Sequence, residues 1–383
     1  MDPIYLDHAA TTPLADEVRE AMLPYLGAAW GNPSSVHRRG IAAREAVDRA
    51  RAQVARAVGA EPRNVIFTSG GTEANNLALF GLMRGPRPRG GGLWVGPTEH
   101  ASVRAAADAL EQEGFDVERG ELRPSGEVDL DALDAALTPD TRLVAQMLVS
   151  NEFGSIYPTS CIAALLKARD SGAHLHVDAI QALGKLPLSL EELGADSVAL
   201  SAHKVNGPQG VGALVCAREL PLHPLLHGGG QEGGRRSGTE NVAGIVGFGV
   251  AAERADRAQA ATLRHLGALR AQLLSGVEGL QAVDCLAPGD HEQQQPGILS
   301  LRVAGAPAEV WLHHLDASGV VCSVGSACQA NKKEISPVLL AAGLSPEEAR
   351  QVLRLSLGGD NTLEEIERAC VALHDVSREL ARL

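Results

Sequence analysis

Residues 64–79 read NVIFTSGGTEANNLAL, a strand, a turn and a helix start in direct succession. The apolar run at 65–67 predicts a buried strand, Gly70 and Gly71 predict a turn, and a helix is expected to begin near Glu73. The backbone N–H groups of such a turn and the helix N-terminus can bind an anion such as phosphate. The turn matches neither the P-loop nor the GxGxxG pattern, and an ordinary strand-to-helix turn is an equally good interpretation.

The same alternation continues on both sides of this unit. A helix is expected from about residue 35 to Gly59, with apolar residues at helical spacing. Strands alternating with helices predict an α/β fold with a mainly parallel sheet covered by helices on both faces. The further predicted strands are 92–96, 141–150, 173–179, 196–201 and 210–216, and the further predicted helices are 101–113, 129–137 and 158–171.

The pattern changes after a long helical stretch that ends near residue 274. The rest of the chain predicts a smaller α+β domain, and two capping boxes, at 345–348 and 362–365, mark helix starts within it. We therefore expect a large domain at 15–255 and a small domain made of 1–14 and 256–383. The small domain's predicted strands are 296–303, 319–324 and 352–357, and its predicted helices include 307–317 and 345–350.

Composition limits the possible partners and the location. The formal net charge is −13, and no long basic stripe offsets it, which argues against nucleic acid or an anionic membrane as a partner. No apolar run is long enough to span a bilayer, and the N-terminal residues lack the features of a signal peptide. We therefore expect a cytoplasmic protein.

The six cysteines do not indicate a structural role. They lie at irregular spacing, with no CxxC pair and no zinc-type cluster, so we expect no structural disulfide and no metal site. Five of them are expected to be small buried or neutral residues. Cys328 differs, because it lies in SVGSACQANKKE, residues 323–334, just before a polar and charged run typical of an exposed loop.

Two charged residues at predicted strand ends indicate a specific chemistry. Asp178 ends one strand, and Lys204 follows the next strand 26 residues later. A pyridine cofactor needs this pair: the lysine forms a Schiff base with its aldehyde, and the carboxylate keeps the ring nitrogen protonated. Taken singly, Asp178 could be a helix N-cap and Lys204 a surface lysine. Together they lie at the sheet edge where α/β proteins bind ligands, and His100 follows a third strand, where it could stack on a flat ring.

Ten motifs in collinear order resemble the pyridoxal-phosphate-dependent cysteine desulfurases of the class V aminotransferase group. The resemblance covers nearly the whole chain and implies the fold of type I pyridoxal-phosphate enzymes, with a large and a small domain. The motifs are YLDHAATTP (5–13), GNPSSVH (31–37), FTSGGTEANN (67–76), TEHASV (98–103), SNEFG (150–154), HVDAIQALGK (176–185), SAHKVNGPQGVGAL (201–214), RRSGTEN (235–241), SVGSAC (323–328) and LRLSLG (353–358).

The resemblance also implies a role for individual residues. Lys204 would bind pyridoxal 5'-phosphate covalently and then move protons, and Arg354 would bind the substrate carboxylate with its fork of donors. His100 would stack on the cofactor ring, Asp178 would pair with the ring nitrogen, and Asn151 and Gln181 would contact the ring hydroxyl. The phosphate would be held by Gly71, Thr72, Ser201 and His203, with Thr239 from the other subunit of a homodimer.

The resemblance explains the thiol in the predicted loop. Cys328 would attack the sulfur of L-cysteine, hold it as a persulfide and leave L-alanine. Lys332 and Lys333 would favour the thiolate if they lie near it. The length of this segment matches the long-loop desulfurases that supply iron–sulfur assembly, so the expected acceptor is a scaffold protein or a thiolation enzyme such as one acting on tRNA.

Three positions depart from the family pattern, and other functions compete. Gly233 and Gly359 stand where arginine is common, and Asn206 replaces a common aromatic residue, which puts surface contacts and partner docking in doubt. The alternatives are another pyridoxal enzyme of the same fold, such as an aminotransferase, a selenocysteine lyase or a kynureninase-like hydrolase, and a non-enzymatic sulfur carrier or interaction subunit. The acceptor, the preference between sulfur and selenium and the turnover rate are not specified by the sequence.

Overall fold

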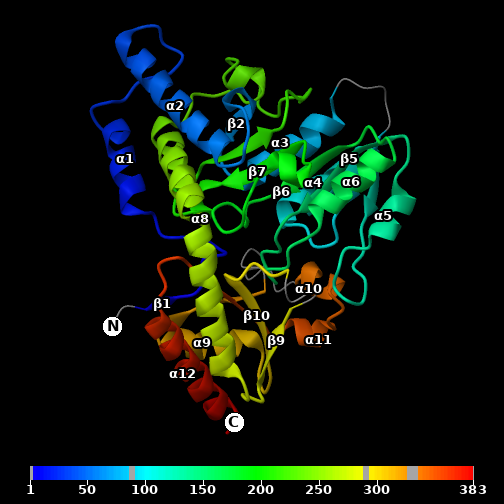
Figure 1. Cartoon of the computed structure of the whole chain (residues 1–383), viewed down its shortest axis with the longest axis vertical. Coiled ribbons are helices and arrows are strands. Elements are labelled where there is room, and N and C mark those ends of the chain that lie inside the picture. Colours follow the sequence, from blue (N-terminus) through cyan, green and yellow to red (C-terminus); the bar gives the residue numbers. More distant parts are fainter. Residues whose placement is uncertain (1–2, 86–90, 288–292, 326–334, 383) are drawn as a thin grey trace.

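The computed structural model describes residues 3–85, 91–287, 293–325 and 335–382. Figure 1 shows two lobes connected by one long helix, α8, with both chain ends at the smaller lobe. The predicted helix at 158–171 and the predicted strands of the large domain are present within a few residues of the expected bounds. The predicted α/β class with a mainly parallel sheet is therefore confirmed.

The larger lobe is built on a seven-stranded sheet with the order β2-β8-β7-β6-β5-β3-β4. Strand β8 runs antiparallel to β2 and β7, and the other neighbours are parallel. Strands β2, β3, β5, β6 and β7 therefore end at the same edge of the sheet. The strands are β2 (Val65–Thr68), β3 (Gly92–Val95), β4 (Asp116–Arg119), β5 (Thr141–Met147), β6 (His174–Asp178), β7 (Ser197–Ser201) and β8 (Gly212–Cys216).

Helices cover both faces of this sheet, as a strand buried on both faces requires. Along β5, Leu143 packs with α3 and α4 on one face, and Val144 packs with α2, α6 and α8 on the other. The helices of this lobe are α1 (Asp16–Leu26), α2 (Arg38–Arg56), α3 (Gly71–Met83), α4 (Ala101–Gln112), α5 (Leu130–Ala136), α6 (Thr159–Ala168) and α7 (Leu190–Leu193), with single 3₁₀ turns η1 (Pro62–Asn64), η2 (Ala202–Lys204) and η3 (Glu232–Gly234).

The smaller lobe has a four-stranded antiparallel sheet with the order β12-β13-β10-β9, and a separate parallel pair β1-β11. Its apolar core is centred on Trp311 and includes Ile4 and Leu6 from the start of the chain. The strands are β1 (Ile4–Tyr5), β9 (Val283–Leu286), β10 (Ile298–Val303), β11 (Val320–Val321), β12 (Ser323–Val324) and β13 (Val352–Ser356); the helices are α9 (Ala308–Ala317), α10 (Pro337–Ala341), α11 (Pro346–Ala349) and α12 (Leu363–Leu380).

Helix α8 (Val242–Val277) has 36 residues and contributes to both cores. Phe248 and Ala252 pack in the core of the large sheet, whereas Leu266 and Leu273 pack in the core around Trp311. The predicted domain boundary at residue 255 falls inside this helix. The division into 15–255 and 1–14 with 256–383 stays a prediction.

Some elements differ from the prediction or were not predicted. The expected single strand at 319–324 is broken at Cys322 into β11 and β12, which belong to different sheets. Strand β4 has the polar sequence DVER and is largely exposed at the sheet edge, so it lacks the apolar pattern that indicates a strand. Helix α1 was also missed, and it contains Pro24.

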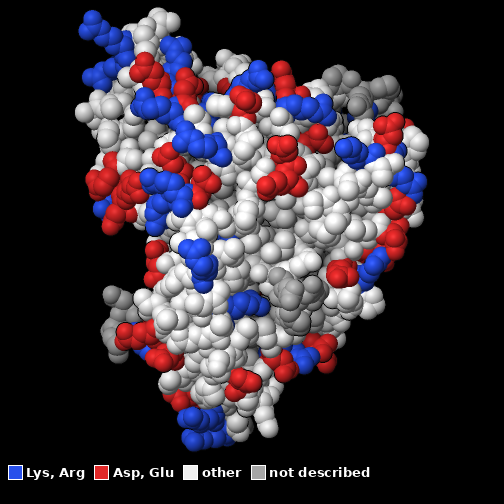
Figure 2. Space-filling model, in the orientation of Figure 1, with Lys and Arg blue, Asp and Glu red and all other residues white. Residues whose placement is uncertain are grey.

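The surface, the helices and the described side chains add three observations. On the face shown in Figure 2, charges of both signs are interspersed over the larger lobe, and uncharged surface covers most of the middle. Within the described ranges, no helix is both long and apolar enough to cross a bilayer. The same residues contain no group of three or more His, Cys, Asp or Glu arranged to hold a metal ion.

Both predicted capping boxes are present. In α12, the Thr362 hydroxyl accepts from the Glu365 N–H (3.2 Å), and the Glu365 carboxylate accepts from the Thr362 N–H (2.9 Å). Replacing Thr362 with alanine should lower the free energy of unfolding by about 1 kcal/mol, because an N–H of the first turn loses its partner. Urea unfolding followed by circular dichroism measures this loss. Leu363→Ala, at an exposed neighbouring position, is the control, and an equal loss in both variants would contradict the capping role.

Candidate active site

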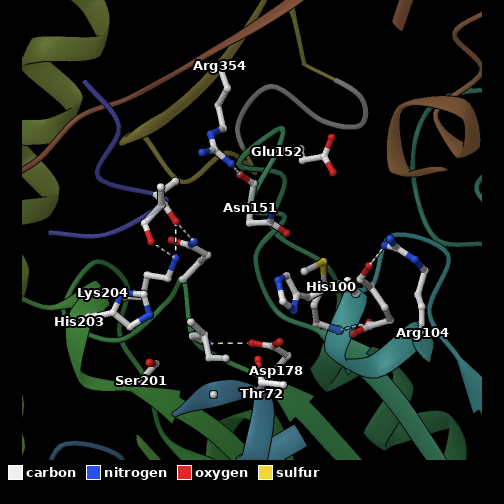
Figure 3. A pocket seen from close by; sticks show the side chains of 18 residues that line it. Thr72, His100, Arg104, Asn151, Glu152, Asp178, Ser201, His203, Lys204 and Arg354 are labelled. Atoms are coloured by element: carbon white, nitrogen blue, oxygen red, sulfur yellow. Dashed lines mark hydrogen bonds between the residues drawn. The ribbon is translucent and has the colours of Figure 1, made fainter. Parts of the chain in front are cut away.

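A cavity of about 330 Å³ lies at the edge of the large sheet where the parallel strands end. It is lined by residues that follow β2, β3, β5, β6 and β7, by Ala9 and Ala10 from the N-terminal segment, and by Arg354 of β13. Figure 3 shows Lys204, Asp178, His100 and Arg354 around this space. The structure therefore brings together residues that are up to 345 positions apart, counted from Ala9 to Arg354.

Asp178 is the last residue of β6 and is 5% exposed. Its Oδ1 accepts from the Ile180 N–H (3.0 Å), and its Oδ2 accepts from the Asn75 side-chain amide (2.8 Å). Two N–H donors suit an ionised carboxylate, which only accepts hydrogen bonds. Both the position and the hydrogen bonds are those of a carboxylate held in place for a ligand in the cavity.

Lys204 ends the 3₁₀ turn η2 directly after β7. Its Nζ donates to the carbonyl oxygens of Ala9 and Ala10, the latter at 2.7 Å. The amine therefore lies at the cavity wall, opposite the loop that carries His100 (Figure 3). Its location matches the amine required by the predicted covalent bond to a cofactor.

His100 is the N-cap residue of α4, and its ring borders the cavity. Its Nδ1 accepts from the Ser102 backbone N–H (3.1 Å). Burial lowers the pKa of His100, and the charge of Lys204 lowers it further, while Asp178 opposes the shift. His100 is therefore a neutral imidazole at pH 7, which can stack on an aromatic ring without repelling a positive charge on that ring.

The N-terminus of α3 and the end of β7 form an adjoining hollow of about 320 Å³, lined by Gly71, Thr72, Ser201 and His203. The Ser201 hydroxyl oxygen is buried and has no hydrogen-bond partner among the described residues. Burial, followed by the charges of Lys204 and Lys185, lowers the pKa of His203 to about 4. An unpartnered hydroxyl beside free helix N–H groups is an arrangement that fits a phosphate.

Gln181 and Asn151 border the same cavity. The Gln181 amide donates to the Ala9 carbonyl (3.0 Å), and its oxygen accepts from Lys185 Nζ (3.2 Å). Since a carbonyl oxygen only accepts, Ala9 fixes the NH₂ group of Gln181 toward itself and leaves the Gln181 oxygen facing Lys185. Burial lowers the pKa of Lys185 to about 7, and the charge of Lys204 contributes to this shift.

Arg354 lies in the middle of β13 and is 2% exposed, yet its guanidinium reaches the cavity. It donates to Asp7 Oδ1 (2.8 Å) and to the Asn151 carbonyl (3.0 Å), while its Nε has no partner among the described residues. A buried guanidinium with a neighbouring carboxylate keeps its position and retains donors for a second anion.

One predicted site residue is not brought to the cavity, and another lies outside the described residues. Thr239 is exposed and contributes to neither the cavity nor the adjoining hollow, although neighbouring Arg236 pairs with Glu73 of α3 (2.8 Å). Cys328, with Lys332 and Lys333, lies outside the described residues. Their predicted roles stay predictions.

The sequence did not reveal two buried acids that line the cavity, Glu99 and Glu152. Burial raises the pKa of Glu99 well above its ordinary value, and the charge of Asp178 adds to the effect. Burial also raises the pKa of Glu152, against the opposing hydrogen bond from Ser336. Each lies beside a predicted site residue, His100 or Asn151, and this adjacency was the only available signal.

Comparisons with known proteins agree with this arrangement. Residues 4–369 match the family model of the class-V aminotransferases. The cysteine desulfurase IscS of Dictyoglomus turgidum is 39% identical over 98% of this chain and 95% of its own. Two solved structures are also similar over most of the chain. A NifS-like protein has a TM-score of 0.91 and 34% identity, and the match covers 100% of both chains. SspA in complex with cysteine has a TM-score of 0.79 and 33% identity, and the match covers 92% of this chain and 98% of that one.

The packing around Gly71 generates a prediction for ligand binding. A Cβ atom at residue 71 would lie 2.1 Å from Cδ1 of Ile180, which lines the cavity. Gly71→Ala should therefore displace Ile180 and weaken the binding of the cofactor predicted from the sequence, pyridoxal 5'-phosphate, by about tenfold or more. Absorbance titration of the apoprotein measures the affinity.

A second substitution serves as the matched control. Ile180→Val removes the Cδ1 atom that would clash, so the double variant Gly71→Ala with Ile180→Val should regain most of the lost affinity. Equal weakening in the single and double variants would show that this contact is not the cause.

Proposed function

Because the chain belongs to the cysteine desulfurases of the class-V aminotransferase family, we propose that it converts L-cysteine to L-alanine and holds the sulfur as a persulfide on Cys328. The thiol of Cys328 and one molecule of L-cysteine give one persulfide and one molecule of L-alanine, so this sulfur transfer needs no external oxidant or reductant. The observation that carries the proposal is the convergence of Lys204, Asp178 and Arg354 on one cavity.

The residues of the cavity fit pyridoxal 5'-phosphate. The buried, unpartnered Ser201 hydroxyl and the α3 N-terminus would hold the phosphate, and Asp178 would bind the ring nitrogen. The half-buried His100 ring would lie against the cofactor ring, and Gln181 and Asn151 would contact the ring oxygen. When bound, this cofactor supplies the electron sink for breaking bonds at the amino acid.

Lys204 would attach the cofactor and later carry protons at its Nζ. In the structure this atom is held by the carbonyl oxygens of Ala9 and Ala10, which accept but cannot protonate it. The Ala9 oxygen also accepts from Gln181, so release of Lys204 leaves that oxygen partly satisfied. This arrangement supports a lysine that changes its partner during the reaction.

Arg354 would bind the carboxylate of L-cysteine. Its guanidinium is already fixed by Asp7 and by the Asn151 carbonyl, and its remaining donors border the cavity. Binding to a fixed guanidinium costs little side-chain entropy and orients the amino acid. One of the similar solved structures is SspA in complex with cysteine, and this similarity supports cysteine as the substrate here.

The described residues on both sides of segment 326–334 lie next to the cavity. The Cβ position of Gly325 is 4.0 Å from Glu152 Oε2, and the Ser336 hydroxyl donates to the same carboxylate at 2.8 Å. Cys328 follows Gly325 by three residues in the sequence. The position of the described Gly325 and Ser336 beside Glu152 supports Cys328 as the acceptor of the substrate sulfur.

A second copy of the chain would complete the phosphate site. Thr239 is exposed and does not line its own chain's cavity, as expected if it serves the cavity of a partner. The α1–α2 region also exposes large apolar side chains, Leu26 and Trp30 among them at 68% and 63%. We propose a homodimer, with an iron–sulfur scaffold or a thiolation enzyme as the sulfur acceptor; the cytoplasmic location stays a prediction.

The decisive experiment mixes the purified protein with L-cysteine and measures free alanine and protein-bound persulfide. Wild type should form alanine and carry persulfide at Cys328, located by mass spectrometry after alkylation. Cys328→Ala should lose the persulfide and nearly all turnover, and Lys204→Ala should lose both and the visible absorption of the bound cofactor. Cys161→Ala, which removes another exposed thiol, is the matched control and should behave like wild type.

The alternatives give different outcomes. An aminotransferase would consume an amino-group acceptor and be unaffected by Cys328→Ala. Cofactor absorption without alanine from cysteine would refute the desulfurase proposal, and so would full activity in Cys328→Ala. A chain without bound cofactor would favour an interaction subunit.

The position of Arg354 generates a separate kinetic prediction. Arg354→Ala should raise the KM for L-cysteine by about 10²-fold, because one charge-assisted bidentate interaction is lost. Arg354→Lys should recover only part of this loss, since lysine lacks the planar fork. Arg302→Ala on neighbouring β10, whose partners are Asp284 and Glu348, is the control, and an unchanged KM in Arg354→Ala would exclude the carboxylate-binding role.

A further inference from the structure

Asn75 lies behind the site, on α3, and is completely buried. Its Nδ2 contacts Asp178 Oδ2 at 2.8 Å and Ser102 Oγ at 2.9 Å. Its Oδ1 contacts His176 Nε2 at 3.0 Å. One amide therefore links the carboxylate at the end of β6 to the start of α4, where His100 is the N-cap residue.

The direction of each hydrogen bond follows from the chemistry of the partners. A carboxylate facing Asn75 can only accept, so the NH₂ group must be on the Asp178 side and the oxygen on the His176 side. The two amide hydrogens are then divided between Asp178 and Ser102, and none remains for another partner. The reverse orientation would place two acceptors 2.8 Å apart in a buried site.

This orientation determines the hydrogen on His176. Since the Asn75 oxygen only accepts, His176 must carry its hydrogen on Nε2, and its Nδ1 accepts from the Ser197 hydroxyl at 2.9 Å. His176 and Ser197 are lateral neighbours in the β6–β7 ladder, which explains this contact. Burial lowers the pKa of His176 to about 3, so the ring is neutral at pH 7.

The second hydrogen bond of the Asn75 NH₂ group connects, through Ser102, to His100. Ser102 Oγ accepts from Asn75, so its hydroxyl hydrogen is available for His100 Nδ1 at 2.8 Å. The Ser102 backbone N–H donates to the same nitrogen. Both donors require an unprotonated Nδ1, which places the ring hydrogen of neutral His100 on Nε2.

We propose that Asn75 is the positioning residue that holds Asp178 and His100 in fixed orientation and fixes the hydrogen-bond direction from Ser197 to His100. Leucine would fill a similar volume but supply no donor or acceptor, and aspartate would place a second carboxylate against Asp178. The inference rests on the proposed roles of Asp178 and His100 toward the cofactor. Asn75 itself does not line the cavity, so it acts through these two residues.

The first test observes the position of the ring hydrogen on His176 directly. Histidine-selective ¹⁵N labelling of the holoenzyme and long-range ¹H–¹⁵N correlation spectra distinguish Nε2–H from Nδ1–H, and His176→Gln assigns the signal. Wild type should show Nε2–H. In Asn75→Leu the hydrogen should move to Nδ1, where the Ser197 hydroxyl can accept it, whereas Ser197→Ala should retain Nε2–H.

The second test separates positioning from mere packing by kinetics. Asn75→Leu should lower kcat by on the order of 100-fold and change the KM for L-cysteine only a few-fold, because Arg354 is untouched. Ser197→Ala and Asn76→Ala should remain within about twofold of wild type. Asn76 is a matched control, since it lies next to Asn75 on α3 and also contacts Ser102. Its Nδ2 donates to the backbone carbonyl oxygen of Ser102 (3.2 Å) and not to the hydroxyl.

Three results would each overturn the proposal. The first is an Nδ1–H form of His176 in wild type, and the second is an unchanged position of the ring hydrogen between wild type and Asn75→Leu. The third is a normal kcat in Asn75→Leu. If Asn75→Leu does not fold, Asn75→Ala, which also supplies no side-chain donor or acceptor, is measured instead, with the same expectations and the same outcomes that overturn them. Asp178→Ala tests the proposed role of Asp178 separately from that of Asn75. Normal turnover in this variant would refute the role of Asp178, whereas the His176 spectra would still decide the role of Asn75.

Discussion

The register between β6 and β7 is the constraint on which the site depends. His176 pairs with Ser197 and Asp178 pairs with Ala199, so Asp178 and the β7 end that leads to Lys204 reach the same sheet edge. Side chains alternate between the two faces of a strand, and a slip of one residue would turn Asp178 toward the opposite face. Both β6 and β7 are buried on both faces, so such a slip would be costly because apolar and polar side chains would exchange environments.

The N-terminal segment joins the two lobes at the same place. Leu6 belongs to the apolar core of the smaller lobe, and Asp7 pairs with Arg354. Three residues later, the chain contacts the large lobe: Ala9 and Ala10 bind Lys204 through their carbonyl oxygens. A short stretch therefore sets the distance between the residue proposed to bind the cofactor and the residue proposed to bind the substrate carboxylate.

Sequence patterns predicted the main sheet well, and they predicted the site only where its chemistry is unusual. Asp178 and Lys204 could be selected because charged residues directly after buried strands are informative about ligands. Asn75 and His176 could not, because a polar residue within a helix or strand gives no sign that it is completely buried. Edge strand β4 was not predicted for a related reason, since its exposed polar residues do not alternate with apolar ones. The position of Thr239 relative to a cavity depends on a partner chain, which the pattern of one chain does not describe.

Burial has a consistent effect on the groups around the cavity. It lowers the pKa of His100 and of His203, so both rings are neutral near pH 7, and it raises the pKa of Glu99 well above its ordinary value. Among the charged groups of the cavity, Asp178 is held by its two N–H donors and Arg354 by Asp7. In a buried site these interactions act at a low effective dielectric, where they are stronger than in water. A negatively charged ligand group is thus directed to the guanidinium and to the helix N-terminus, and a protonated ring nitrogen is directed to Asp178. The neutral side chains between them keep these two interactions separate.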